Sequence, residues 1–322
     1  MAEFYQHNLD ELRDPWNDIY LRSRIRSPFS SPDWAEVWWK HFNEGSTLYA
    51  GSVEEDGKVI GIAPLRLKDG ILCFIGNDNL FDFQDFVVDK SREEIFYRAL
   101  LHHLSEIKVA RLELGPFQPD SSIHRTLLPL ARESGLDVNC TQDDVTVSLD
   151  LPADEASYLA LLSGKQRHEL LRKERRLNEE GDVSFRVQDR ADNADIDLFL
   201  QFFRESREDK NRFLTPPVEL FMRDIIYSSE ARGMLRLGIL ELNSTPIAAT
   251  LCFEYQDGMY LYNSGYSPDY RWLSAGLLSK YYSIRDSIMK RKSYYNFLKG
   301  AEKYKFHLGG KETGLFRCII NL

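Results

Sequence analysis

The sequence predicts an α/β fold with mixed sheets, arranged as two tandem domains of similar construction. Three observations support this prediction. The chain has 322 residues, a length typical of two domains. Strand patterns joined by tight turns come before long amphipathic helices twice along the chain. Finally, residues 50–54 resemble residues 237–241, and at the same spacing residues 59–63 resemble residues 246–250.

The first half begins with helical spacing of apolar residues, interrupted at Pro28 and Pro32. Three strands follow, separated by turns at 55–58 and at Asp69-Gly70. The pattern then predicts a short strand, a helix, a strand and a helix that Gly135 ends. The expected strands are 48–53, 59–67, 71–75, 85–88 and 109–114. The expected helices among them are 93–107 and 122–134.

The second half opens with helical patterns and continues as a strand meander with turns at 243–246 and 256–258. A loop containing Pro268 leads to a helix whose apolar residues share one face. The expected elements are helices over 154–180, 193–207 and 275–290, and strands over 234–242, 247–255, 259–265, 294–298 and 314–321.

The same element order in both halves indicates a duplicated domain rather than a short structural repeat, whose period would be about 20–50 residues. We place the boundary after Pro152, where a strand pattern ends. The expected domains are therefore residues 1–152 and 153–322.

Composition narrows the class of function. The formal net charge of −9 opposes general attraction to nucleic acid or anionic membrane, so any anion site must be local. We find no signal-peptide pattern and no apolar run long enough to span a membrane, and we expect a cytoplasmic protein. The four cysteines have no metal or redox spacing, and we expect them to be reduced.

Several segments in order resemble the BioF-like acetyltransferase family. This group has tandem GNAT domains, includes the CelD-like proteins of cellulose biosynthesis and is related in architecture to the FemAB peptidyltransferases. The segments are residues 28–34, 57–65, 163–177, 274–276 and 297–305, although Ala275 stands where the family usually has proline. The resemblance implies transfer of an acyl group to an amine or hydroxyl, with acyl-CoA as a co-substrate and no permanently bound cofactor.

The resemblance places the acyl-donor site at the start of the 275–290 helix, where GNAT proteins hold the pyrophosphate of coenzyme A. Arg271, Ser274, Ala275 and Gly276 match that loop, with serine where glycine is usual at 274. A helix N-terminus offers N–H donors and partial positive charge to an anion. Ser274 also suits an ordinary N-cap.

By the same resemblance, the preceding strand binds the pantetheine arm through Tyr262 and Asn263. Tyr260, Tyr262 and Tyr266 alternate along this strand, so we expect them to share a face. Tyr266 is a candidate acid for the leaving thiolate. Packing in the core is the alternative role for these tyrosines.

Residues 165–176 form a basic helix within an acidic chain. Arg167 and Arg172 are its candidate substrate-binding residues. Their ligand is a coenzyme A phosphate, a sugar phosphate or, by the FemAB relationship, tRNA. A solvated helix face is the structural alternative.

Two further groups are candidates for acceptor binding and proton transfer. In the late loop, Glu302 is a candidate base, and Lys299, Tyr304 and Lys305 are candidate substrate contacts. In the first half, Asp82 is a candidate acceptor contact and Asp85 a candidate base. Surface charge or turn formation explains these residues equally well.

The sequence contains no phosphate-binding loop of the nucleotide-binding type and no GxSxG nucleophile motif of hydrolases. Its histidines have no metal-binding spacing. The sequence therefore predicts an acyltransferase with an unidentified acceptor, for which a cell-envelope or polysaccharide precursor is one class. An aminoacyltransferase using aminoacyl-tRNA and a non-catalytic binding protein are the alternatives.

Overall fold

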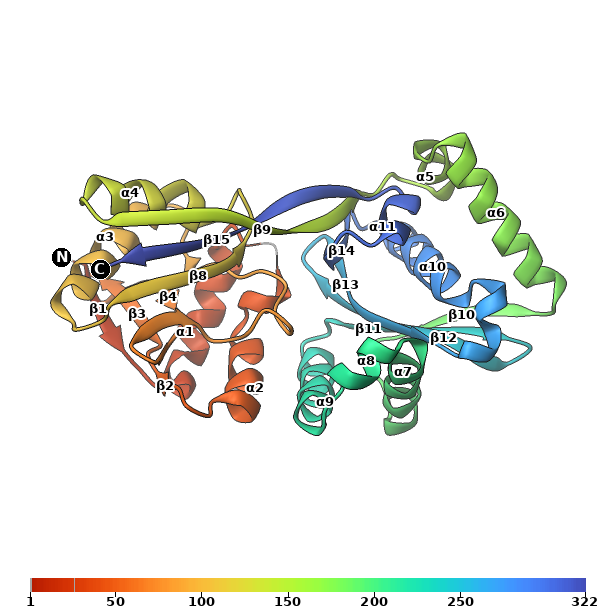
Figure 1. The fold of residues 1–322 in the computed structure, drawn as a ribbon, viewed down its shortest axis with the longest axis horizontal. Helices are drawn as coiled ribbons and strands as arrows, with labels where there is room; N and C mark the ends of the chain where they lie inside the picture. Colours follow the sequence, from red (N-terminus) through yellow and green to blue (C-terminus); the bar gives the residue numbers. More distant parts are fainter. Residues whose placement is uncertain (1, 26) are drawn as a thin grey trace. The chain divides into compact units, whose positions relative to one another are not determined.

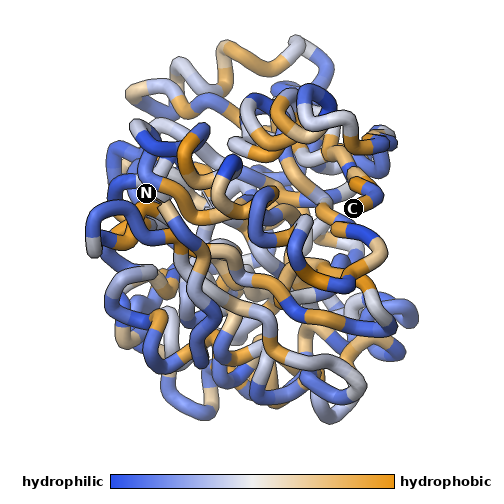
Figure 2. The backbone as a smooth tube through the Cα atoms, turned by 90° about the vertical axis from the view of Figure 1, so that its left-hand side faces the viewer, coloured by the Kyte–Doolittle hydropathy of each residue, from blue (hydrophilic) through white to orange (hydrophobic). Residues whose placement is uncertain are grey.

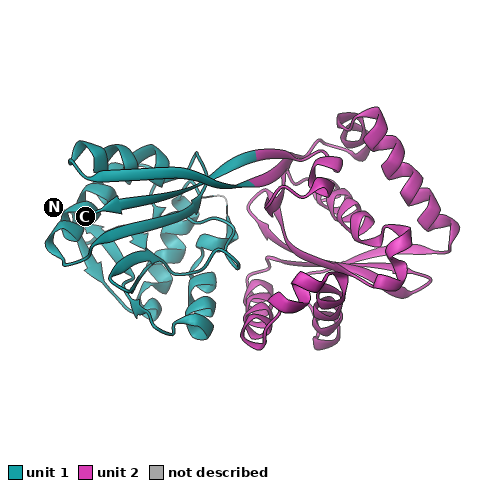
Figure 3. Ribbon diagram, in the orientation of Figure 1, with its two compact units in different colours: residues 1–145, 313–322 teal, residues 146–312 magenta. Residues whose placement is uncertain are grey.

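The computed structural model describes residues 2–25 and 27–322. The chain forms two compact units, drawn in teal and magenta in Figure 3: unit 1 is Met1–Val145 with Thr313–Leu322, and unit 2 is Thr146–Glu312. Helices and strands alternate in both units (Figure 1).

Unit 1 begins with an edge strand and two helices, continues as short strands and ends its first pass with a long strand. Its elements are β1 (Ala2–Gln6), α1 (Leu9–Arg22), η1 (Pro28–Ser30), α2 (Pro32–Phe42), β2 (Thr47–Leu48), β3 (Gly51–Glu55), β4 (Lys58–Ala63), β5 (Leu65–Lys68), β6 (Ile71–Phe74), β7 (Val87–Val88), α3 (Glu93–Glu106), β8 (Arg111–Phe117), η2 (Ile123–Leu127), α4 (Leu128–Glu133) and β9 (Asp137–Asp150).

The strands of unit 1 belong to two sheets. One has the order β1-β3-β4-β7, and the other contains β9-β15-β8-β6-β5-β2. The core between them and the helices is aromatic and aliphatic, and Phe86, Phe96 and Tyr97 are among its fully buried side chains. Hydrophobic and hydrophilic stretches alternate along the chain in Figure 2, as amphipathic elements around such a core require.

Unit 2 consists of helices followed by a meander and a final helix–strand pair. Its elements are α5 (Glu155–Leu161), α6 (Gly164–Glu179), β10 (Val183–Gln188), α7 (Asn193–Ser206), α8 (Glu208–Phe213), α9 (Pro216–Ala231), β11 (Leu235–Leu242), β12 (Thr245–Tyr255), β13 (Gly258–Tyr266), η3 (Pro268–Leu273), α10 (Ala275–Met289), β14 (Tyr294–Lys299) and α11 (Lys303–His307). The chain then returns to unit 1 as β15 (Lys311–Asn321).

The sheet of unit 2 has the order β10-β11-β12-β13-β14-β9. Helices α6 and α10 cover one face, and α7, α8 and α9 cover the other (Figure 1). Helix α7 lies against β13 at Gly265, where a Cβ atom would come within 2.2 Å of backbone atoms of Phe202 and Phe203. This close packing fixes α7 on the sheet.

The two units repeat one plan. In unit 2, β12 and β13 form one long antiparallel pair, followed by α10 and β14. In unit 1, the corresponding pair is divided into β5 with β6 and β4 with β7, followed by α3 and β8. The division comes from residues 75–86, which separate β6 from β7. Lys68 pairs with Ile71 and Tyr255 with Gly258, so the Asp69-Gly70 turn corresponds to the Gln256-Asp257 turn.

Strand β15 changes how the units are delimited. The sequence-based division puts everything after residue 152 in the second domain, whereas residues 313–322 pack in unit 1. Strand β15 lies between β9 and β8, and its Cys318 and Ile320 belong to the unit 1 core. Such a return of the chain leaves no signal in local periodicity.

The expectation of four reduced cysteines is wrong for two of them. Cys140 on β9 and Cys318 on β15 form a disulfide, with a sequence separation of 178. Neighbouring strands bring them together, which their spacing in the sequence does not reveal. Cys73 and Cys252 are free thiols.

Candidate functional site

The most irregular part of the unit 2 sheet is the boundary between β13 and β14. The two strands are parallel and pair at only three positions, from Gly258 with Tyr294 to Tyr260 with Asn296. On its other side, β13 remains paired with β12 as far as Tyr266. The two strands therefore separate towards their carboxyl ends, which is where open α/β sheets bind ligands.

A bulge at Tyr262 marks the start of this separation. Leu261 pairs with Cys252 and Asn263 with Leu251, so Tyr262 is an extra residue in the ladder. The expectation that the three tyrosines share a face is therefore wrong. Tyr260 pairs with Phe253 and Tyr266 with Ala248, and these partners lie on opposite faces of β12.

Tyr266 points towards the start of α10. A Cβ atom added to Gly276 would lie 2.7 Å from Cδ1 of the Tyr266 ring, so only glycine fits there without moving the ring. Tyr262 lies on the other face, with its ring 5.5 Å from that of Phe253. Tyr266 is thus the tyrosine beside the candidate donor loop.

The donor loop ends in a left-handed residue. Ser274 has φ 61° and ψ 32°, a conformation that favours glycine, and this explains why the related loops have glycine there. Its side chain makes no capping hydrogen bond to α10, so the simple N-cap role does not apply. Helix α10 begins at Ala275 with no acidic residue in its first turn, and its first N–H groups remain available to an anion.

The basic helix α6 lies beside this loop. The guanidinium of Arg176 stacks over the exposed Trp272 ring at 4.9 Å, which joins α6 to η3. Arg271, Arg167 and Arg172 are all exposed. The exposed basic side chains of α6 are Lys165, Arg167, His168, Arg172, Arg175 and Arg176.

The late loop is organised by one buried lysine. Lys305 is 2% exposed, and its Nζ donates to the carbonyl oxygens of Leu298, Lys299 and Gly300 at 2.6–3.0 Å. It also pairs with Glu302 at 2.9 Å. Although burial raises the pKa of Glu302, the Lys305 and Arg207 charges hold it below its usual value. Glu302 is therefore a weak base, and Lys305 primarily holds the chain after β14.

Two further lysines, which the sequence analysis did not select, reach the same region. Lys280 on α10 is 7% exposed, and its Nζ donates to the Gly276 carbonyl at 2.6 Å and lies 4.8 Å from the Tyr304 ring centre. Lys210 on α8 donates to the Ser264 carbonyl of β13 at 2.5 Å. Burial and the neighbouring positive charges lower the pKa of Lys280 to about 7 and that of Lys210 to about 8.

Lys280 was detectable in principle, because it lies four residues after Gly276 and helical side chains point back towards the N-terminus. Lys210 carries no such signal, since its approach to β13 depends on how α8 packs.

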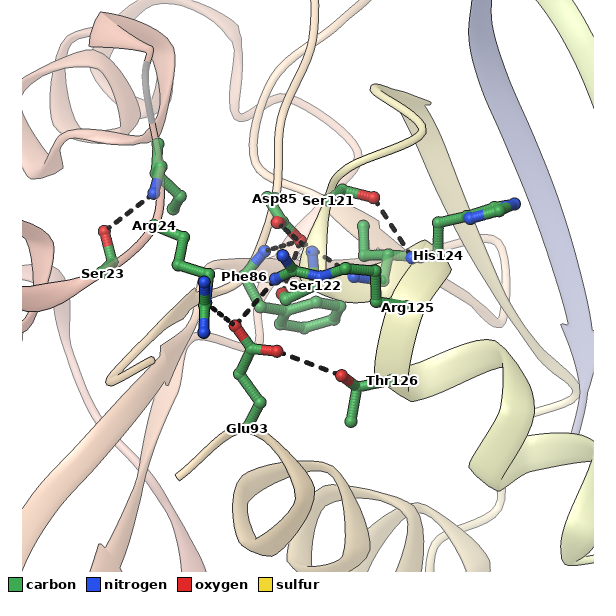
Figure 4. Close-up of polar contacts among 12 residues, drawn as sticks. Ser23, Arg24, Asp85, Phe86, Glu93, Ser121, Ser122, His124, Arg125 and Thr126 are labelled. Atoms are coloured by element: carbon green, nitrogen blue, oxygen red, sulfur yellow. Dashed lines mark hydrogen bonds and ion pairs between the residues drawn. The ribbon is translucent and has the colours of Figure 1, made fainter. Parts of the chain in front are cut away.

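In unit 1, Asp85 serves the start of a helix (Figure 4). Its carboxylate accepts hydrogen bonds from the backbone N–H of Ser122 at 2.6 Å, from the Ser122 hydroxyl at 2.9 Å and from the N–H of Ile123 at 3.3 Å. Burial raises the pKa of Asp85 to about 7 against these hydrogen bonds. Asp85 thus acts first as a cap for η2, and Asp82 lies in the same 75–86 segment.

The unit 1 loop that corresponds to the donor loop is unsuited to an anion. Asp89 accepts from the N–H and hydroxyl of Ser91, and Glu93 and Glu94 occupy the first turn of α3. The Glu93 carboxylate pairs with Arg125 at 2.9 Å (Figure 4). Negative charge at this position opposes phosphate binding.

Across 2–25 and 27–322, no group of three or more His, Cys, Asp or Glu side chains is placed to hold a metal ion. No helix in the described part of the chain combines the length and the apolar character needed to cross a bilayer.

Comparison with known proteins identifies the fold. Residues 164–306 match a family model described as an acetyltransferase (GNAT) domain. No curated protein sequence matches the chain. Among solved structures, the chain is similar to FemX, with a TM-score of 0.67, 15% identity, and coverage of 98% of this chain and 96% of that one.

Two other solved structures are similar over nearly the whole chain. The C-terminal domain of a protein described as a lysylphosphatidylglycerol synthetase from Agrobacterium fabrum has a TM-score of 0.62, 14% identity, and coverage of 97% and 92%. A tandem GNAT protein from the clavulanic acid biosynthesis pathway has a TM-score of 0.51, 15% identity, and coverage of 99% and 98%. At these identities the likeness concerns the fold, and the predicted tandem GNAT-like α/β architecture is confirmed.

Proposed function

We propose that unit 2 is an acyltransferase site that takes an acyl group from acyl-CoA and transfers it to an amine or hydroxyl. The observation that carries this proposal is the separation of β13 from β14 directly before the helix that begins at Ala275. A pyrophosphate on the α10 N-terminus would send the pantetheine arm along β13 into the opening between the strands. Such a donor places the reaction in the cytoplasm, where acyl-CoA is made and used.

In this proposal the chain contributes mainly positioning. The N–H groups at the start of α10 and Arg271 hold the pyrophosphate, and backbone donors of β13 polarise the thioester carbonyl. The acceptor nitrogen or oxygen bonds to the carbonyl carbon and releases its proton to water, and the C–S bond breaks. The departing thiolate takes a proton from the candidate donor Tyr266, which regains one from water. Unit 1, with acidic side chains at the corresponding loop, is assigned no donor site.

A second function has one observation in its favour. The exposed basic side chains of α6 and the stacked Arg176–Trp272 pair flank the donor loop, and basic residues with an exposed ring suit a single-stranded RNA end. An aminoacyltransferase that uses aminoacyl-tRNA would need this surface. The fold-level likeness to FemX is compatible with this candidate and does not distinguish it from the first.

The deciding measurement is thermal unfolding with coenzyme A, acetyl-CoA and longer acyl-CoA thioesters. A ligand at about 100 times its Kd stabilises the folded chain by about 2.7 kcal/mol and raises Tm by a few degrees. Gly276→Ala should abolish the shift, because the new Cβ displaces Tyr266 at the donor loop.

Gly164→Ala is the matched control, since Gly164 starts α6 and has open space around its Cα. No shift with any thioester at millimolar concentration would overturn the acyl-CoA proposal. Binding of an aminoacyl-tRNA that weakens when Arg172, Arg175 and Arg176 become alanine would then favour the second function. Failure of both donors would leave a non-catalytic binding protein.

A further inference from the structure

The opening between β13 and β14 has an unusual concentration of buried positive charge. Lys280 approaches it from α10, Lys210 from α8, and Lys305 from α11, where it contacts the end of β14. The charges of Lys210 and Lys305 both act on Lys280 and lower its pKa. Three amines from three different helices thus converge on one part of unit 2.

The acidic groups in this region are already engaged. Glu302 pairs with Lys305 at 2.9 Å, and Asp209 pairs with Arg207 at 2.8 Å. Within the described residues, no carboxylate lies within 4.0 Å of the Lys210 or Lys280 amine. Both amines instead donate to backbone carbonyls, of Ser264 and Gly276.

Buried ammonium groups that meet carbonyl oxygens but no carboxylate are costly, because desolvation and mutual repulsion both disfavour the charged form. A lysine needed only for packing would be replaced by methionine without that cost. An anion placed between the two amines would remove the repulsion and hold both protons. The arrangement is therefore suited to a bound anion.

We propose that Lys210 and Lys280 bind a carboxylate of the reacting molecules, so that this site selects either an acyl group that ends in a carboxylate or an acceptor that carries one. The proposal rests on the proposed function for its place in the reaction, since the opening is where acyl group and acceptor would meet. The convergence of the two buried amines is independent of which acyl donor the protein uses.

Matched ligand pairs test the two sources of the carboxylate. Succinyl-CoA and butyryl-CoA have four-carbon acyl groups and differ in the terminal carboxylate; alanine and alaninamide differ in the same way on the acceptor side. We expect the carboxylate member of one pair to bind at least about tenfold more tightly in calorimetry, the effect of one charge-assisted contact. Tighter binding of succinyl-CoA than of butyryl-CoA would assign the carboxylate to the acyl group. Tighter binding of alanine than of alaninamide would assign it to the acceptor.

Lys280→Met and Lys210→Met should each reduce this preference to less than about twofold, because methionine keeps the volume and loses the charge. Lys290→Met is the control, since Lys290 ends the same helix and pairs with Asp286 at its exposed end. Binding of coenzyme A without an acyl group should be unchanged in all three variants.

The pH dependence gives an independent readout. The groups that face Lys280 are Lys210, Glu302, Lys305 and Cys252. Those that face Lys210 are Arg207, Asp209 and Glu302. Because the free Lys280 amine loses its proton near pH 7, carboxylate binding should take up protons there and weaken above pH 8.

Two results would overturn the inference: no preference within either pair, or a preference that persists in the Lys210→Met/Lys280→Met double variant. Failure of the proposed function would appear differently, as no binding of coenzyme A or of either thioester. The alanine pair alone would then decide whether the two lysines bind a carboxylate.

Discussion

At the scale of single residues, Lys280 is the side chain whose environment departs furthest from its intrinsic chemistry. A helical position on a buried face would ordinarily hold an apolar residue, yet it carries an amine between the Gly276 carbonyl and the Tyr304 ring. Burial, followed by the charge of Lys210, lowers its pKa from 10.5 to about 7. The folded chain therefore resists charging this amine, whereas the unfolded chain does not.

This difference predicts how stability changes with pH. The folded-state pKa of Lys280 lies below the unfolded value, so the unfavourable contribution is full below pH 7 and disappears as pH rises towards 10.5. Lys280→Met should be more stable than the natural chain at pH 7 in urea unfolding, and the advantage should shrink steadily up to pH 10.5. The free energy of unfolding of one protein is subtracted from that of the other at each pH. Contributions from the other titrating groups, which both proteins share, then cancel.

Lys290→Met serves again as the comparison, because it makes the same change of side chain at the exposed end of the same helix. A Lys280→Met protein that is less stable by the same amount at every pH would contradict the prediction. The Lys280 amine would then have the same pKa in the folded and the unfolded chain.

At the scale of the elements, local patterns located most helices and strands because their apolar periodicity is strong. The 275–290 helix appears as α10 (Ala275–Met289), and the meander of the second half as β11, β12 and β13. Sequence reasoning missed α9, the edge strand β1 and the short helix α11 within the expected late loop. Short or edge elements depend on tertiary packing more than on their own periodicity.

In the candidate site, too, local sequence patterns predict some features, whereas others depend on tertiary packing. The donor loop follows from a local pattern, and the structure places Arg271, Ser274 and Gly276 at the start of α10. The bulge at Tyr262 is invisible in the sequence, and it reverses the face on which Tyr266 lies relative to Tyr260. The Lys210 contact depends on a helix packed against the strand and could not be anticipated either.

Close packing of α7 on β13 gives a prediction at this scale. Gly265→Ala would place a methyl group 2.2 Å from backbone atoms of α7, which cannot rotate away as a side chain can. We expect a loss of about 1–3 kcal/mol in the free energy of unfolding from overpacking. Gly164→Ala, at an open position, provides the baseline. A Gly265→Ala protein as stable as this control would show that α7 moves freely on the sheet.

At the scale of the whole molecule, the return of β15 joins the end of the chain to its first unit. Leu315, Cys318 and Ile320 are fully buried, and the Cys140–Cys318 disulfide fixes the strand to β9. Division at residue 152 would therefore separate unit 1 from one of its central strands. The similar halves of the sequence are not independent pieces of the fold.

Removal of residues 313–322 tests this dependence. Without β15, strands β8 and β9 lose their shared neighbour, and the unit 1 core loses Cys318 and Ile320. Hydrogen exchange should then accelerate throughout residues 2–25 and 27–145, whereas the helices and β10–β13 of unit 2 keep their protection. Removal of Asn321 and Leu322 alone should have a much smaller effect. Unchanged protection of unit 1 in the longer truncation would refute the dependence.

The position of β15 also sets the order of events on the ribosome. Synthesis proceeds at about 5–20 residues per second, and N-terminal domains usually fold first. Here the strand that completes unit 1 is translated after every residue of unit 2. Strands β8 and β9 therefore lack their shared neighbour until residues 313–322 have left the ribosome. The part of the protein that is made first is therefore the part that finishes folding last.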